Sequence, residues 1–493
     1  MSEVDYADVQ GLVRFGYGQM NRASYALVKV KDSAVARSWL RAAPITSAIA
    51  TNPPPTTALN VALTAPGLRK LGAPEALISS FSHEFRGGMG EESRARQLGD
   101  MHQNAPARWS WGQYGDEPHA LIMFFGQAGE FESFVERTKA NSWSEAFEKV
   151  RWLETSDLDE KEPFGFADGI SQPQIDWEQQ RATPCTQGSY TNISTLGEFL
   201  LGYANEYGKF TERPLLDSDD STAELLPAID MPSKRDLGRN GTYLVMRQLE
   251  QDVRGFWQFL YQESGGDLAE ARALGAKMVG RTEAGDPLVS IQPEPIPGID
   301  PAPMQKNQFT YENDRAGARC PFGAHIRRAN PRNTDFPERS AGWLRKLIIM
   351  AGFGRNEFRS DLISSVRFHR LLRRGREYGA GLSPEEAVEP APPDDPARGL
   401  HFICLNANIS RQFEFLQNAW IANTKFAGMT GESDPLLGTR EPLEGCPVTA
   451  DFNLPREAGL RRRVSGLPQF VTVRGGAYFF LPSLRALRYL TRA

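Results

Sequence analysis

The chain contains 493 residues, of which 40% are hydrophobic and 24% are charged, and its formal net charge is −5. Because a single core stops growing well below this length, we expect two domains. The ordinary globular composition excludes a disordered chain, and the slight negative charge gives no support for a nucleic-acid partner, which requires a concentrated basic face.

Cysteine usage and the start of the chain predict the compartment. Four widely spaced cysteines form no C-x-x-C pair: Cys185, Cys320, Cys404 and Cys446. They fit neither a zinc site nor a disulfide framework and are typical of a reducing compartment. The opening M-S-E-V-D-Y lacks the basic and apolar regions of a secretory signal, and the apolar runs are too short to cross a bilayer. We therefore expect a cytoplasmic protein without a membrane partner.

Apolar strands and amphipathic helices alternate through the first part of the chain. The predicted order is strand, helix, strand, strand, helix, strand, over residues 24–30, 33–50, 57–64, 119–126, 130–140 and 146–154. In the second helix, Phe131, Phe134 and Val135 recur at the spacing of one helix face. This order is that of a ferredoxin-like βαββαβ unit, in which helices pack on a sheet.

A second set of elements follows a long connection over 155–240, and a connection of this length usually has a functional or interdomain role. We predict strands over 241–249, 364–372, 400–406, 470–473 and 477–480, and helices over 251–264, 267–279, 411–422 and 482–490. An acidic, proline-rich insertion covers 383–398. The pattern predicts an α+β protein with two ferredoxin-like halves, 1–235 and 236–493, and a cavity between them.

Three short segments contain residues that core packing does not require. In G-x-x-D-G at 165–169, the glycines allow a tight turn that aims Asp168 into a cavity. The segment C-P-F-G-A-H-I-R-R-A-N-P-R at 320–332 contains His325, which suits a metal or haem iron, and its basic neighbours suit anionic groups such as carboxylates. The arginine pair of L-L-R-R-G at 371–375 leaves the end of a predicted strand.

Each segment has a simpler interpretation when it is taken alone. The first can be an Asx turn, His325 can be a hydrogen-bonded structural histidine, and the arginine pair can be a solvated strand end. The sequence contains no H-E-x-x-H, G-x-S-x-G or Walker motif and no well-placed Rossmann fingerprint. A zinc hydrolase, a serine hydrolase and a nucleotide-binding enzyme are therefore not indicated.

Together and in this order, the three segments resemble the dye-decolourising peroxidases. The resemblance extends from Val9-Gln10-Gly11 to the segments at 399–402 and 412–415, so it covers most of the chain. It implies a fold of two ferredoxin-like halves, related to the dimeric α+β barrels, with a haem b cavity. It also implies hydrogen peroxide and a bulky aromatic reducing substrate as partners, in a monomer or homodimer.

The resemblance assigns roles to individual residues. His325 matches the proximal iron ligand, Asp168 the distal acid and Arg373 the distal arginine. The remaining haem contacts fall on Gly169, Ile170, Ser171, Asn330, Pro331, Arg332, Leu400 and Phe402. Glu414 is the acid expected to orient His325.

These residue types suit the chemistry of a peroxidase. A carboxylate such as Asp168 can carry a proton from one peroxide oxygen to the other. Arg373 stays cationic, stabilises the departing oxygen and lowers the pKa of the neighbouring acid by roughly 1–3 units. A carboxylate beside His325 would raise the basicity of the ligand.

Two departures and two alternatives accompany this prediction. Gly375 stands where some relatives carry asparagine, and the long spacing from His325 to Arg373 indicates the larger, insertion-bearing branch. Trp343, Tyr378 and Trp420 are candidates for electron transfer to bulky dyes, although core packing explains each of them. The alternatives are a haem-handling or iron-releasing protein with incidental peroxidase activity, and an inactive scaffold. The latter would not need Asp168, His325 and Arg373 together.

Overall fold

One large antiparallel sheet organises the protein in the computed structural model, which describes residues 3–140, 142–180, 192–291, 305–332, 366–441, 449–456 and 458–492. Its strands run in the order β10-β12-β9-β15-β2-β3-β1-β4, and β11 also pairs with β12. Their bounds are β1 (Arg22–Val30), β2 (Thr57–Leu63), β3 (Ala120–Gly126), β4 (Phe147–Glu154), β9 (Thr242–Gln251), β10 (Leu372–Arg373), β11 (Arg376–Tyr378), β12 (Gly399–Asn406) and β15 (Val471–Leu481).

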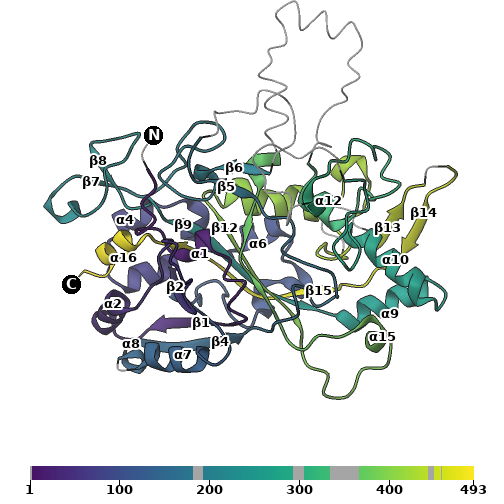
Figure 1. Cartoon of the computed structure of the whole chain (residues 1–493), viewed down its shortest axis with the longest axis horizontal. Helices are drawn as coiled ribbons and strands as arrows, with labels where there is room; N and C mark the ends of the chain where they lie inside the picture. Colours follow the sequence, from purple (N-terminus) through teal and green to yellow (C-terminus); the bar gives the residue numbers. More distant parts are fainter. Residues whose placement is uncertain are drawn as a thin grey trace, which may run out of the picture.

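The first half has the predicted ferredoxin-like arrangement, with strand order β2-β3-β1-β4. Its central strands are buried on both faces because helices cover one side and other segments cover the opposite side. Helices α2 (Ser33–Ala42), α7 (Phe131–Lys139) and α8 (Trp143–Ala146) lie together at one end of the molecule (Figure 1). The rings of Trp39 and Trp143 meet edge to face at 5.1 Å between centroids, which joins α2 to α8.

The second half repeats this order. Its first strand is β9, its second is β10 together with β11, its third is β12 and its fourth is β15. Helices α9 (Val253–Glu263) and α10 (Leu268–Val279) follow its first strand. The halves join where β15 pairs with β2, through Phe480 opposite Leu63. The prediction of an α+β fold with two ferredoxin-like halves is therefore confirmed. The sheet remains open among the described strands, and the division at 235/236 lies within β8 (Lys234–Asp236) and stays a prediction.

Shorter elements complete the described part of the chain. The helices are α1 (Gly11–Arg14), α3 (Ala65–Lys70), α4 (Glu75–Ser79), α5 (His83–Gly87), α6 (Glu92–Leu98), α12 (His325–Ala329), α15 (Pro384–Ala387) and α16 (Leu484–Leu490). Three two-stranded sheets pair β5 (Gln174–Asp176) with β6 (Ile193–Thr195), β7 (Leu215–Asp217) with β8, and β13 (Asp451–Leu454) with β14 (Arg462–Ser465). Single 3₁₀ turns include η5 (Gln305–Asn307) and η7 (Val366–His369).

Five predicted elements differ from the structure. The helix expected over 33–50 ends at Ala42, because the residue before Pro44 is driven out of helical conformation. The strand expected over 364–372 is instead η7 followed by the two-residue β10, and residues 364–365 lie outside the described residues. The two strands expected over 470–480 are one continuous β15.

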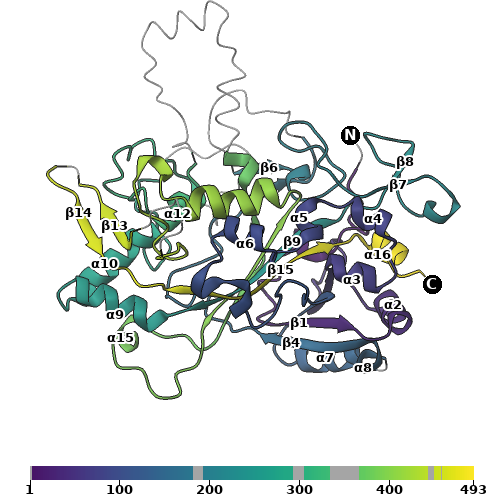
Figure 2. The same ribbon diagram turned by 180° about the vertical axis from the view of Figure 1, so that it is seen from behind.

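The helix expected over 411–422 is wound as π-helix in η8 (Ser410–Glu414) and η9 (Leu416–Ala422). π-Helical turns are rare and occur mostly at functional sites. This segment crosses the upper side of the sheet next to α6, where Gln417 donates a hydrogen bond to Leu98 O at 3.3 Å (Figure 2).

Candidate active site

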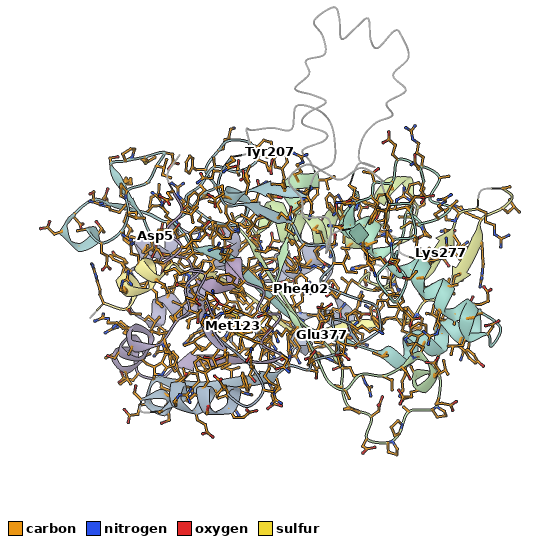
Figure 3. The ribbon with its side chains drawn as sticks, viewed as in Figure 1. Asp5, Met123, Tyr207, Lys277, Glu377 and Phe402 are labelled. Atoms are coloured by element: carbon orange, nitrogen blue, oxygen red, sulfur yellow. The ribbon has the colours of Figure 1, made fainter. Side chains whose placement is uncertain are left out.

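A cavity of about 770 Å³ lies over one face of the second half of the sheet. Side chains alternate between the two faces of a strand, so residues two apart reach the same cavity. The wall that the sheet gives to the cavity is formed by Arg247, Leu249 and Gln251 of β9, Leu400 and Phe402 of β12, and Val471 and Val473 of β15. Phe402 and Glu377 lie near the middle of the molecule (Figure 3). Glu377 of β11 and Leu249 of β9 lie on either side of Leu400 of β12, because both pair with it.

The cavity brings together nine of the twelve residues predicted for the site. They are Asp168, Gly169, Ile170, Ser171, His325, Asn330, Arg373, Leu400 and Phe402. Three separate segments supply them: the loop after β4, α12 with its flanks, and β10 with β12. Segments more than 200 residues apart in the sequence therefore meet at one site.

Asp168 and Arg373 form an ion pair at the cavity wall, with Arg373 Nη1 donating to Asp168 Oδ1 at 2.8 Å. The side chains retain 35% and 32% of their exposure, which faces the cavity they both line. Burial disfavours the Asp168 anion, but the Arg373 charge and the Gly169 N–H outweigh it and hold the pKa of Asp168 below its ordinary value. Gly169 has φ of 74°, which explains the glycine at this turn.

His325 begins α12 and lines the cavity from another side. Its Nδ1 lies 3.0 Å from Oδ2 of Asp434, a fully buried carboxylate. Burial disfavours the charged ring, but the Asp434 carboxylate outweighs this effect and raises the pKa of His325. A hydrogen bond at Nδ1 fixes the tautomer and leaves Nε2 as the donor atom for a metal.

The acid that contacts His325 is therefore Asp434, and the prediction of Glu414 is wrong. Glu414 Oε1 accepts from Arg94 Nη1 at 2.6 Å and from the Tyr478 hydroxyl at 2.8 Å, in a buried cluster. Asp434 has no sequence motif that would identify it. Its other oxygen accepts from the backbone N–H groups of Leu436 and Leu437 at 2.9 and 2.8 Å, so the side chain is held in place.

The arginines around His325 are buried and build the segment. Arg327 donates to Asp314 Oδ2 at 3.0 Å, and Arg328 donates to Trp420 O at 2.8 Å. Arg332 donates to the carbonyls of Asn307 and Phe309, each at 2.9 Å. Within the described residues, Pro331 and Arg332 are not part of the cavity lining.

Arg332 still reaches the cavity wall indirectly through Asn307. The Arg332 guanidinium also contacts the Asn307 side chain, whose Oδ1 accepts from Ser171 Oγ at 3.0 Å. Four arginines that were not predicted for the site line the cavity directly: Arg247, Arg281, Arg370 and Arg376. Arg281 follows α10, and no motif singled it out.

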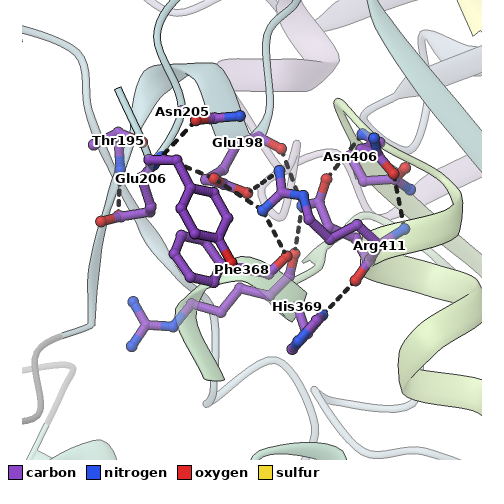
Figure 4. Close-up of polar contacts among 12 residues, drawn as sticks. Thr195, Glu198, Asn205, Glu206, Phe368, His369, Asn406 and Arg411 are labelled. Carbon is purple, nitrogen blue, oxygen red and sulfur yellow. Dashed lines mark hydrogen bonds and ion pairs between the residues drawn. The ribbon is translucent and has the colours of Figure 1, made fainter. Parts of the chain in front are cut away.

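A second network fixes the wall next to η8. Arg411 bonds the buried carboxylate of Glu198 and Phe368 O, and the His369 ring donates to Arg411 O (Figure 4). His369 lines the cavity and stacks on Phe415 at 3.7 Å between ring centroids. The π-helical segment is thereby tied to η7.

The structure also places Gly375, where some relatives carry asparagine, and two of the three candidates for electron transfer. A Cβ at Gly375 would lie 2.2 Å from His401 O, so the close approach of β12 excludes an asparagine there. Tyr378 stacks on His401 at 4.5 Å, and Trp420 is only 6% exposed and lines the cavity. Trp343 lies outside the described residues.

The cavity fits the predicted haem. It offers an imidazole whose Nδ1 is anchored to a carboxylate, apolar walls at Leu400, Phe402 and Leu436, and cations for carboxylate groups. Its volume lies in the ordinary range of cofactor sites. No group of three or more acidic, histidine or cysteine side chains suited to a free metal ion occurs among the described residues. No helix of the described chain is long and apolar enough to cross a membrane.

Comparisons with known proteins support the resemblance to the dye-decolourising peroxidases. The chain is 28% identical to the dye-decolorizing peroxidase msp1 of Mycetinis scorodonius, over 98% of this chain and 87% of that protein. It is 29% identical to the multifunctional dye peroxidase DyP2 of Amycolatopsis sp., over 88% of this chain and 82% of that protein. No family model matches the sequence.

A solved structure shares the fold. The decolorizing peroxidase of Auricularia auricula-judae superposes with a TM-score of 0.72 at 24% identity, covering 99% of this chain and all of that chain. The resemblance predicted from three motifs is therefore confirmed: this chain is homologous to proteins named dye-decolorizing peroxidases along nearly its whole length.

Proposed function

From this homology, we propose that the protein is a haem b peroxidase that reduces hydrogen peroxide with electrons from dyes, phenols or similar aromatic donors. The observation that supports the proposal best is that the Asp168–Arg373 pair lines the same cavity as His325, whose ring contacts the buried Asp434. A distal acid with a cation and a proximal histidine with a carboxylate are the groups that peroxide cleavage requires.

Haem b, when bound through His325, supplies the iron at which the O–O bond breaks. Asp168 is ionised because its pKa is low, so it can take the proton from one peroxide oxygen and deliver it to the other. Arg373 stabilises the negative charge that develops on the oxygens. Asp434 holds the His325 ring and strengthens Nε2 as a ligand.

The overall reaction balances when two aromatic donors each give one electron and one proton. Hydrogen peroxide then becomes two water molecules, and each donor is left as a radical. Donors too large for a 770 Å³ cavity that also contains haem would react at the surface. Trp420 and Tyr378, two of the three candidates that the sequence offers, would carry the electron inward.

A spectroscopic experiment tests the proposal. Protein reconstituted with haem should show a Soret band that changes when hydrogen peroxide is mixed in. His325→Ala should lose the ligated spectrum, whereas His102→Ala, an exposed histidine paired with Glu441, should keep it. A Soret band that peroxide leaves unchanged would favour the haem-handling alternative. Absence of any Soret band would reject a haem function.

A further inference from the structure

Glu162 is a second carboxylate in the cavity wall, six positions before Asp168. Its side chain accepts hydrogen bonds from Phe164 N at 3.0 Å, from Phe166 N at 3.1 Å and from Gln251 Nε2 at 2.8 Å. Two donors belong to the loop that carries Asp168, and Gln251 ends β9. The carboxylate therefore fastens this loop to the sheet.

The backbone of the loop closes around the same residue. Glu162 N donates to Phe166 O at 2.9 Å, and Gly165 N donates to Glu162 O at 2.8 Å. Asp168 N donates to Glu160 O at 2.9 Å, so the segment on both sides of Glu162 holds the distal acid. The place of Asp168 in the cavity thus depends on how Glu162 is held.

The two carboxylates ionise in different pH ranges. Burial raises the pKa of Glu162 to about 7, and the Asp168 charge adds to the rise, although the three N–H donors oppose it. Arg373 keeps the pKa of Asp168 low. Two carboxyl groups whose surroundings move their pKa values apart have different protonation states at neutral pH.

The charged groups around Glu162 come from every neighbouring wall. The charged and titratable groups that line the same cavity are Glu160 and Asp168 on the loop of Glu162, Arg373, Arg376 and Glu377 on β10 and β11, His401 on β12, Arg247 on β9 with its partner Asp100, Arg281 after α10, His325 on α12, and His369 and Arg370 at the end of η7. Arg247 is committed to Asp100, and Arg281 donates to the carbonyls of Gly285 and Lys306. Ionisation of Glu162 therefore adds a negative charge that no dedicated cation balances within the described residues.

We propose that Glu162 is a positioning residue for the peroxide step, which fastens the loop that carries Asp168 to the sheet. This inference rests on the proposed peroxidase function. In the uncharged form, Glu162 still accepts hydrogen bonds from the loop. It then does not compete for the positive charge of Arg373, which pairs with Asp168 and can also interact with the incoming peroxide. In the charged form, it opposes the negative charge that develops on the peroxide oxygens.

The test measures the rate of the peroxide reaction in the haem-loaded protein from pH 5 to pH 9. The wild-type rate should fall as pH rises through about 7. Glu162→Gln should lose that fall and be roughly fivefold faster than wild type at pH 8.5, as expected for one charge removed at short range. Glu162→Ala should be slower at every pH, because the loop loses its fastening. Glu270→Gln, at an exposed position on α10, should match wild type.

Gln251→Leu supplies an independent measurement if the Glu162 variants fail to bind haem. It removes a donor that favours the ionised form, so the fall in rate should move to higher pH. The same fall in Glu162→Gln as in wild type, or an unmoved midpoint in Gln251→Leu, would overturn the role of Glu162. A wild-type protein that binds haem but never reacts with peroxide would instead overturn the proposed function.

Discussion

Replacing Arg373 by leucine should separate the two effects of this cation. Arg373 Nη1 lies 2.8 Å from Asp168 Oδ1, and a positive charge at that distance lowers the pKa of an acid by roughly 1–3 units. Without it, burial raises the pKa of Asp168 against only the Gly169 N–H and the His325 charge. The loss of a preorganised charge at the reacting atoms lowers the rate by a further 10²–10³-fold, as a rough expectation.

The expected pH dependence follows from the ionised Asp168. In wild type, the peroxide step persists to low pH and is lost only as pH falls through the depressed pKa of Asp168. In Arg373→Leu, the loss should occur about 1–3 units higher, because the carboxylate takes up its proton earlier. At neutral pH the rate should also be lower by about two to three orders of magnitude.

Stopped-flow mixing of haem-loaded protein with hydrogen peroxide across this pH range measures both quantities. Arg488→Leu is the matched control, since Arg488 is exposed on α16 and does not line the cavity. The Soret band before mixing confirms that each variant carries haem. An Arg373→Leu variant with wild-type rate and an unmoved acid limb would refute the assignment of Arg373 as the distal cation.

Three further substitutions test the remaining groups. Asp168→Asn should bind haem normally but react with peroxide about 10²–10⁴-fold more slowly, and stopped-flow rates close to wild type would remove its role as proton carrier. Asp434→Asn should keep the fold while shifting the iron reduction potential upward, because the proximal ligand becomes a weaker donor; a potential equal to wild type in redox titration would contradict this. Glu414→Ala should lower the free energy of unfolding by about 3–5 kcal/mol in denaturant titration, because Arg94 is left buried without its partner. A stable Glu414→Ala variant with an altered haem spectrum would instead restore its predicted place beside His325.

The periodic elements of the fold were accessible from the sequence because local patterns specify them. Most strands of both halves were predicted to within a few residues. The exceptions are the short β10 and β11, where packing between η7 and η8 takes over, and β15, which was predicted as two strands. The π-helical winding of 410–422 could not be predicted, since its apolar spacing also fits an α-helix. The pairing of β15 with β2, which joins the halves, left no local signal.

The candidate site shows a similar limit. Asp168, His325 and Arg373 stand in motifs with glycine, proline or neighbouring arginines, so their residue types stood out. Asp434 lies 109 positions after His325 and has no such surroundings, whereas Glu414 stood in a segment that resembled the family. Which of two acids reaches a ring is decided by tertiary packing, and here Arg94 and Tyr478 engage Glu414.

The central position of β15 has a consequence for how the protein is made. β15 is the last strand of the sheet in chain order, yet it lies between β9 and β2 and contributes Val471 and Val473 to the cavity wall. During synthesis the first half can form its four strands early, since domains generally fold as units from the N-terminal side. The second half lacks its fourth strand until β15 leaves the ribosome. Cofactor capture must therefore be among the last events of maturation, after translation has passed residue 481.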